Sequence, residues 1–142
     1  MSTGPALRKV GSHTSIHDAA LNHALNLNDD LQDAIAENQM DEAMDISAQI
    51  IDIWENRIIE HANSEEESLY KEMSAHSEEL AKRVIELTRE HDILRVLLAQ
   101  IKEVLQKEGK VTDEAVRKFD TLIIVDEVHN DYEMEALELF HK

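Results

Sequence analysis

The sequence contains one pairing of residue types twice, His61-x-x-x-Glu65 and His129-x-x-x-Glu133, and this pairing is well suited to binding a metal ion. If each pair lies on an α-helix, residues four apart share one face, so both side chains of a pair reach the same point. Imidazole and carboxylate together suit iron, manganese or zinc, whereas calcium prefers oxygen ligands. The two pairs therefore indicate a metal site, provided that the fold brings them together.

The elements that must position these pairs are four amphipathic segments, with apolar residues at helical spacing. We predict them within residues 12–142, after a loose N-terminal arm at residues 1–11. The pattern is interrupted at 37–39, at 74–77 and at Gly109, a residue that suits the position after a helix. The expected N-caps of the later helices are Asp41, a serine at 74 or 77, and Thr112 or Asp113. Short connections make successive helices antiparallel neighbours, so the predicted fold is all-α, an up-down-up-down antiparallel four-helix bundle.

The composition supports this fold and excludes several functions. After residue 11 a single glycine remains and the only proline is Pro5, so the chain has little of the chemistry that hairpin turns need. The formal charge of −17 argues against nucleic acid and anionic membrane surfaces as partners. The absence of cysteine excludes disulfides, zinc fingers and thiol catalysis. No apolar signal core or membrane span is visible, so we expect a cytoplasmic protein.

Four of the eight histidines are predicted to lie at one height along the bundle. In an antiparallel hairpin, two residues lie at the same height when their midpoint falls in the turn. The pair His17 and His61 is centred on residue 39, His61 and His91 on residue 76, and His91 and His129 on residue 110. Each midpoint falls in a predicted connection, and each histidine lies on the apolar stripe of its helix. We therefore predict that the four imidazoles meet in the core.

One helical turn further along, the same faces carry two carboxylates and a fifth histidine. These are Glu65, Glu133 and His13, while the third helix places Leu87 at this level. Two stacked layers of ligands, with carboxylates able to bridge them, predict a two-metal site in the bundle core. The other polar and aromatic residues nearby are expected to be solvated or structural: His23, His76, His141, Glu66 and Glu67 at the surface or in turns, and Trp54 and Tyr132 in the core.

A metal-free alternative is a buried network of hydrogen bonds between histidines and carboxylates. Burying imidazoles and carboxylates costs free energy unless their polar atoms find partners. Such a network could supply these partners without an ion. An exposed charged face is disfavoured because the positions coincide with the apolar stripes.

Taken in order, these residues resemble the hemerythrin-like, HHE cation-binding domain. The resemblance extends from about residue 13 to residue 140 and rests on His17, His61-x-x-x-Glu65, Glu90-His91-x-x-Leu94-Arg95 and His129-x-x-x-Glu133. A ferritin-like bundle is disfavoured because its paired Glu-x-x-His motifs are missing, and Asp126-x-x-His129 is the nearest approach.

The resemblance implies a carboxylate-bridged, non-haem centre of two iron ions, with manganese or zinc as alternatives. Its implied terminal ligands are His17, His61, His91 and His129, and its bridging ligands are Glu65 and Glu133. An open position on one iron would take dioxygen, peroxide or nitric oxide. Oxygen-carrying members place two histidines on the third helix, where this chain has only His91, and their last carboxylate falls where this chain has Met134.

Several uses of such a centre stay open at this stage. They are reversible binding of dioxygen, consumption of peroxide or nitric oxide with electrons from an unidentified donor, and iron storage. Enzyme activity is therefore undecided, and the sequence does not fix the oligomeric state. A metal-free helical adaptor is the alternative from a different class, and it predicts a folded protein that chelators do not affect.

His13 is predicted to replace the missing third-helix histidine, because it lies one turn from His17 at the level of the two carboxylates. Replacing His13 with alanine should then lower the amount of bound iron and change the visible spectrum of the loaded protein. The His23→Ala variant is the control, since His23 is expected to face solvent. Unchanged iron content and spectrum in the His13 variant would show that His13 is not a ligand.

Overall fold

The part of the chain that the structure describes is helical almost throughout. The structure is a computed structural model, and it describes the backbone of residues 10–142 and the side chains of residues 17–142. Within these residues it contains no strand, which confirms the all-α prediction. Its elements are α2 (Val10–Ala36), α3 (Met40–Ile53), the π-helix η1 (Trp54–Ile59), α4 (Glu60–Glu67), α5 (Leu69–His76), α6 (Glu78–Glu108) and α7 (Asp113–Phe140).

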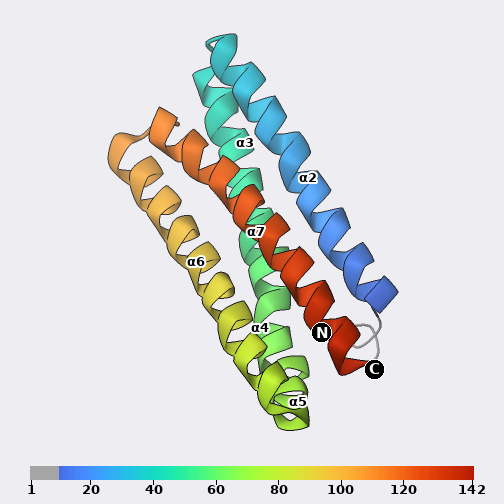
Figure 1. The fold of residues 1–142 in the computed structure, drawn as a ribbon. Helices are drawn as coiled ribbons and strands as arrows, with labels where there is room; N and C mark the ends of the chain where they lie inside the picture. Colours follow the sequence, from blue (N-terminus) through green and yellow to red (C-terminus); the bar gives the residue numbers. More distant parts are fainter. Residues whose placement is uncertain (1–9) are drawn as a thin grey trace.

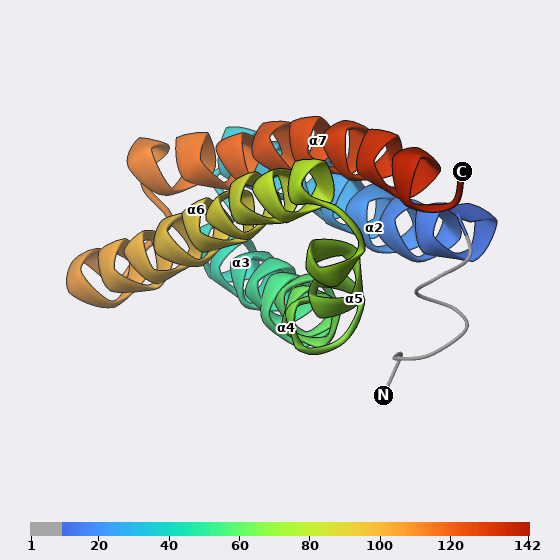
Figure 2. The same cartoon turned by 60° about the horizontal axis from the view of Figure 1, so that its bottom comes forward.

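These elements form four rods that pack as a helical bundle. The rods are α2, the continuous run from α3 to α5, α6 and α7. In Figure 1 each rod runs back along the one before it. The last rod also contacts the first, so α2 and α7 lie side by side in both Figure 1 and Figure 2. No helix among residues 10–142 combines the length and the apolar character that crossing a bilayer would require.

The helix ends follow local sequence signals, with one exception. The Ser77 hydroxyl accepts a hydrogen bond from the Leu80 amide at the start of α6, and Thr112 does the same for Ala115 at the start of α7. Gly109 ends α6 in the left-handed conformation, with a φ of 68°. The three predictions at these positions are confirmed.

The exception is Asp41, which was expected to cap the second rod. Helix α3 begins at Met40 with Gln39 in the N-cap position, two residues before the expected cap, so Asp41 lies in the first helical turn. A carboxylate there is still favourable, because the helix N-terminus carries partial positive charge. Near the N-terminus, α2 begins at Val10, two residues before the expected start of the first helix. Residues 1–9 of the predicted arm lie outside the described residues.

The core consists of two apolar clusters separated along the bundle by polar residues. On α6, Leu94 belongs to the larger cluster and Leu87 to the smaller one, and the buried His91 lies between them. On α7, His129 lies in the same way between Ile123 and Ala136. A layer of buried histidines is therefore closed off on both sides by close-packed apolar side chains.

The second rod is the irregular one, and its irregularities flank the polar layer. Six residues of π-helix, Trp54–Ile59, come directly before α4. A second interruption follows α4 at Ser68, whose φ of −129° and ψ of −71° are not helical. π-Helical segments are rare and often lie next to functional sites. Both interruptions rotate the residues that follow them relative to a regular helix.

Replacing Phe119 with alanine tests the larger cluster away from the polar layer. Phe119 is fully buried, so the variant should lose about 3–5 kcal/mol of unfolding free energy through lost transfer energy and the cavity left behind. The Ile124→Ala variant in the same helix is the control. Its side chain is 60% exposed, and its stability should change by less than about 0.5 kcal/mol. Urea denaturation with a chelator present measures both, and equal losses would contradict the assigned core.

Candidate metal centre

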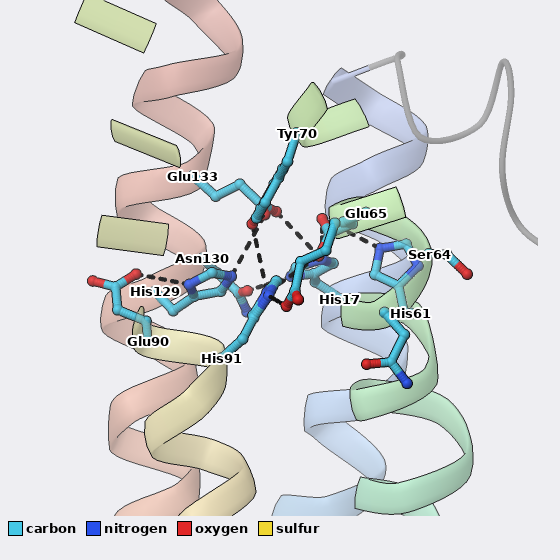
Figure 3. A network of polar contacts seen from close by, with 12 residues as sticks. His17, His61, Ser64, Glu65, Tyr70, Glu90, His91, His129, Asn130 and Glu133 are labelled. Carbon is cyan, nitrogen blue, oxygen red and sulfur yellow. Dashed lines mark hydrogen bonds and ion pairs between the residues drawn. The ribbon is translucent and has the colours of Figure 1, made fainter. Parts of the chain in front are cut away.

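Side chains from all four rods meet in the polar layer (Figure 3). They are His17 from α2, His61 and Glu65 from α4, His91 from α6, and His129 and Glu133 from α7. We call these six residues the centre. Five of them are buried, and His17 is about 10% exposed. The seventh predicted ligand, His13, belongs to α2, but its side chain lies outside the described ones.

The centre divides into two groups that share one residue. Glu65, His91, His129 and Glu133 each offer a donor atom within 4.8 Å of the others, and His17, His61 and Glu65 do the same. Either group could hold a metal ion. Because Glu65 belongs to both, the two groups adjoin.

Each carboxylate of the centre extends one oxygen toward each group. Glu65 Oε1 lies 3.3 Å from His91 Nε2, while its Oε2 lies 3.6 Å from His61 Nε2 and 3.7 Å from His17 Nε2. Glu133 behaves alike, with Oε1 at 3.5 Å from His17 Nε2 and Oε2 at 3.5 Å from His129 Nε2. Both side chains therefore span the space between the groups.

These separations suit ligands around an ion better than they suit direct hydrogen bonds. Protein N–H···O bonds are usually about 2.9–3.0 Å long. Two ligand atoms that are each about 2.1 Å from a metal ion, at angles of about 90–110°, lie about 3.0–3.4 Å apart. The observed range of 3.3–3.7 Å is close to this second figure and needs only small adjustments. The donor atoms therefore fit metal ions between them.

A second set of polar residues orients the histidines. The Nδ1 of His91 donates to Glu66 Oε2 at 2.7 Å, and that of His129 donates to Glu90 Oε1 at 2.7 Å. His17 Nδ1 donates to the Asn130 side chain. When Nδ1 is engaged in this way, the ring presents Nε2 to the inside, which is the usual arrangement of metal-binding histidines.

The electrostatics of the centre favour a cation. Burial lowers the pKa of His129, but Glu133 and Glu90 outweigh burial and raise it to about 10. Burial also lowers the pKa of His91, but the nearby carboxylates of Glu65 and Glu66 outweigh burial and raise it above its ordinary value. The same carboxylates would attract a divalent metal ion more strongly than a proton, because the metal ion carries the larger charge. Metal binding would replace those protons.

The structure adds Tyr70, which the sequence analysis did not select. Its hydroxyl donates a hydrogen bond to Glu133 Oε2 and lies 3.5 Å from His91 Nε2. The ring stacks on His91 with centroids 5.4 Å apart and planes within 5°. Burial, together with Glu133 and Glu65, raises the pKa of Tyr70 well above its ordinary value. On a regular helix the side chain at position 70 would point about 140° away from the side chain at position 65. Because Ser68 is not helical, Tyr70 can point toward the centre all the same.

Glu66 was expected to face water, and this prediction is wrong. Its side chain is only 27% exposed and bonds to both His91 and Arg95, which lower its pKa against the effect of burial. Glu66 lies where α4 faces α6, and from there its carboxylate reaches the outer nitrogen of His91. Its neighbour Glu67 is exposed, as predicted.

The remaining expectations concern residues outside the centre. His23, His76 and His141 are exposed, and Trp54 is fully buried in the core, all as expected. Tyr132 is only partly buried, and its hydroxyl donates to Glu86 in an exposed contact, so its predicted place in the core is only partly right. The sequence favours Tyr132 over Tyr70, because Tyr132 lies within the His129-x-x-x-Glu133 motif, whereas Tyr70 comes five residues after Glu65 and would point away from it on a regular helix.

A small cavity of about 20 Å³ adjoins the centre. Histidines of the centre and Glu65 form one side, and Ala20, Ile58, Ala62, Leu94, Arg57 and the buried Asp126 form the rest. A cavity needs about 10–15 Å³ to hold one water molecule. This space therefore accommodates one small molecule next to the donor atoms.

Comparison with known proteins gives one match. The family model described as the hemerythrin HHE cation binding domain matches residues 14–140. That range contains all six residues of the centre. No curated protein and no solved structure matched the chain.

Replacing Glu66 with alanine tests the orientation of His91. Loss of a carboxylate behind a metal-binding histidine usually weakens metal affinity by about 10–100-fold, and we expect a loss in this range. The Glu67→Ala variant is the matched control, because it removes the neighbouring carboxylate from the exposed face. Competition with a chromophoric chelator measures both affinities. Equal affinities of the two variants would contradict the assigned role of Glu66.

Proposed function

Because this chain belongs to the hemerythrin HHE cation-binding domain family, we propose that it is a non-haem di-iron protein that binds or reacts with dioxygen or a related small oxidant. The two ions would lie inside an up-down-up-down four-helix bundle. The observation that carries the proposal is the position of Glu65 and Glu133, each with one oxygen toward each group of histidines.

The proposed division of ligands follows the two groups. His17 and His61 would hold one ion, and His91 and His129 would hold the other. Glu65 and Glu133 would bridge the two ions, because their oxygens lie 3.3–3.7 Å from the Nε2 atoms of both sides. The two buried carboxylates would also offset two of the four positive charges that two divalent ions carry. His13 stays a predicted additional ligand.

The cavity beside the centre supports a small ligand rather than an organic substrate. Its volume of about 20 Å³ suits a diatomic molecule or peroxide. Iron would supply the electrons for binding or reducing such a ligand. Ile58, Leu94 and the two alanines exclude bulk water on their side, which limits proton leakage to whatever is bound. We propose dioxygen, peroxide or nitric oxide as the partner, and a separate electron donor if the reaction is catalytic.

Iron storage, with the ions stabilising the bundle, is the second candidate. It is favoured by the assembly of the donor atoms from four separate rods, because a site formed only in the folded chain couples metal binding to folding. A metal-free interaction module is less well supported. In it, the contacts between His17 Nε2 and the two carboxylates, at 3.5 and 3.7 Å, would be longer than usual hydrogen bonds.

The experiment that tests the proposal is anaerobic loading with ferrous iron, followed by counting metal per chain. The native chain should bind two ions. The Glu65→Ala variant should bind fewer than one, since Glu65 belongs to both groups, whereas Glu60→Ala in the same helix should still bind two, because Glu60 is exposed. A native chain that binds no iron would overturn the proposal.

Exposure of the loaded protein to air then separates the candidate uses. A visible band that disappears on removing oxygen would support reversible binding. One-way conversion to a ferric state would support consumption of an oxidant or storage. Catalytic turnover of peroxide at an unchanged metal count would then support consumption of an oxidant over storage.

A further inference from the structure

Tyr70 places a polar atom of an aromatic side chain beside the donor atoms of the centre, although it is not one of the six residues (Figure 3). Its hydroxyl contacts Glu133 Oε2, and Glu133 belongs to the group with Glu65, His91 and His129. The same oxygen lies 3.5 Å from His91 Nε2. That distance is about the spacing of two ligands on one ion. The phenol oxygen is therefore already at the edge of this group.

The ring holds this oxygen in place. Tyr70 is 2% exposed and packs in the smaller apolar cluster with Leu69, Met73 and Leu80. Its ring is nearly parallel to that of His91, and the two side chains reach the centre from opposite sides, with the phenol oxygen 3.5 Å from the imidazole Nε2 (Figure 3). A side chain that is already packed in this way loses little further conformational entropy when it binds an ion.

The α6 helix leaves room for such a contribution. Leu87 lies one turn before His91 on α6, is fully buried in the smaller cluster and carries no donor atom. The α7 helix contributes His129 and Glu133 to this group of donors. Tyr70 enters instead from α5, because the non-helical Ser68 changes the direction of the chain between Glu65 and Tyr70.

We propose that the phenol oxygen of Tyr70 is a direct ligand of the ion held by Glu65, His91, His129 and Glu133. This inference rests on the di-iron site proposed above. On binding, the O–H bond breaks and an oxygen–metal bond forms, and the proton leaves with the water that the ion releases. No electron is transferred in this step. Glu133 Oε2, which accepted the phenol hydrogen, becomes available to the same ion.

The chemistry of the ligand is consistent with iron in its oxidised state. A phenolate is a hard, anionic oxygen donor, and tyrosine is known to bind ferric iron in proteins. The competing role is that of a positioning residue, in which Tyr70 only holds Glu133 through a hydrogen bond. The two roles differ in one measurable property. A bound phenolate gives ferric iron a charge-transfer band in the visible region, and a hydrogen-bonded phenol does not.

The test uses the full chain loaded with iron and oxidised to the ferric state. Metal is counted first, and resonance Raman spectra are then excited within the visible band. The chain has two tyrosines, so Tyr132→Phe is the matched control. We expect tyrosinate ring vibrations in the native protein and in Tyr132→Phe, shifted when the tyrosines carry ring deuterium. Complete loss of these vibrations is expected in Tyr70→Phe, with iron still bound.

The outcomes separate this inference from the proposed function. If two iron ions bind and the native spectrum lacks tyrosinate vibrations, the ligand role of Tyr70 is wrong while the di-iron site stands. Vibrations that persist in Tyr70→Phe, or that disappear in Tyr132→Phe, overturn it as well. If Tyr70→Phe fails to fold, retention of the vibrations in Tyr132→Phe still assigns them to Tyr70, because no third tyrosine exists. Absence of bound iron would overturn the proposed function itself.

Discussion

The structure depends on two carboxylates, Glu65 and Glu133, that are almost completely buried among histidine nitrogens. Buried charge of this kind is costly unless it is compensated. Protons on His91 and His129 provide that compensation in the chain alone, which is why the pKa values of these two imidazoles are raised. Metal ions would provide it more completely. The centre is therefore a site for positive charge, which protons on the imidazoles occupy in the absence of metal ions.

The rest of the fold serves this arrangement. Apolar clusters close the polar layer on both sides along the bundle, so water has restricted access to it. Glu66, Glu90 and Asn130 bind the outer nitrogens of three histidines and turn the inner nitrogens toward one another. The irregular second rod brings Tyr70 to the same place. Each of these features restricts the orientation of a donor atom before any ion binds.

Much of this could be predicted from the sequence, because it depends on periodicity. Residues four apart share a helix face, and residues symmetric about a short turn share a height, so the meeting of His17, His61, His91 and His129 follows from spacing alone. The capping residues Ser77, Thr112 and Gly109 are local signals and were predicted for the same reason. Both kinds of inference hold wherever the helices are regular.

The parts that sequence did not predict lie where regularity ends or where contacts cross between helices. Ser68 leaves the helical conformation without a local sequence signal such as glycine or proline, so the inward position of Tyr70 has no counterpart in the periodic pattern. Glu66 was assigned to water because of its direction on an ideal helix, yet it bonds to His91 and Arg95 of the neighbouring helix. Such pairings need the distance between two helices, which a single sequence does not contain.

The central claim is that two ions share Glu65 and Glu133, and the most direct measurement is a crystal structure of the iron-loaded protein with anomalous scattering recorded at the iron edge. Two iron peaks are expected between the four helices, with each carboxylate bound to both iron ions. A single peak, or iron bound only at the acidic surface, would contradict it.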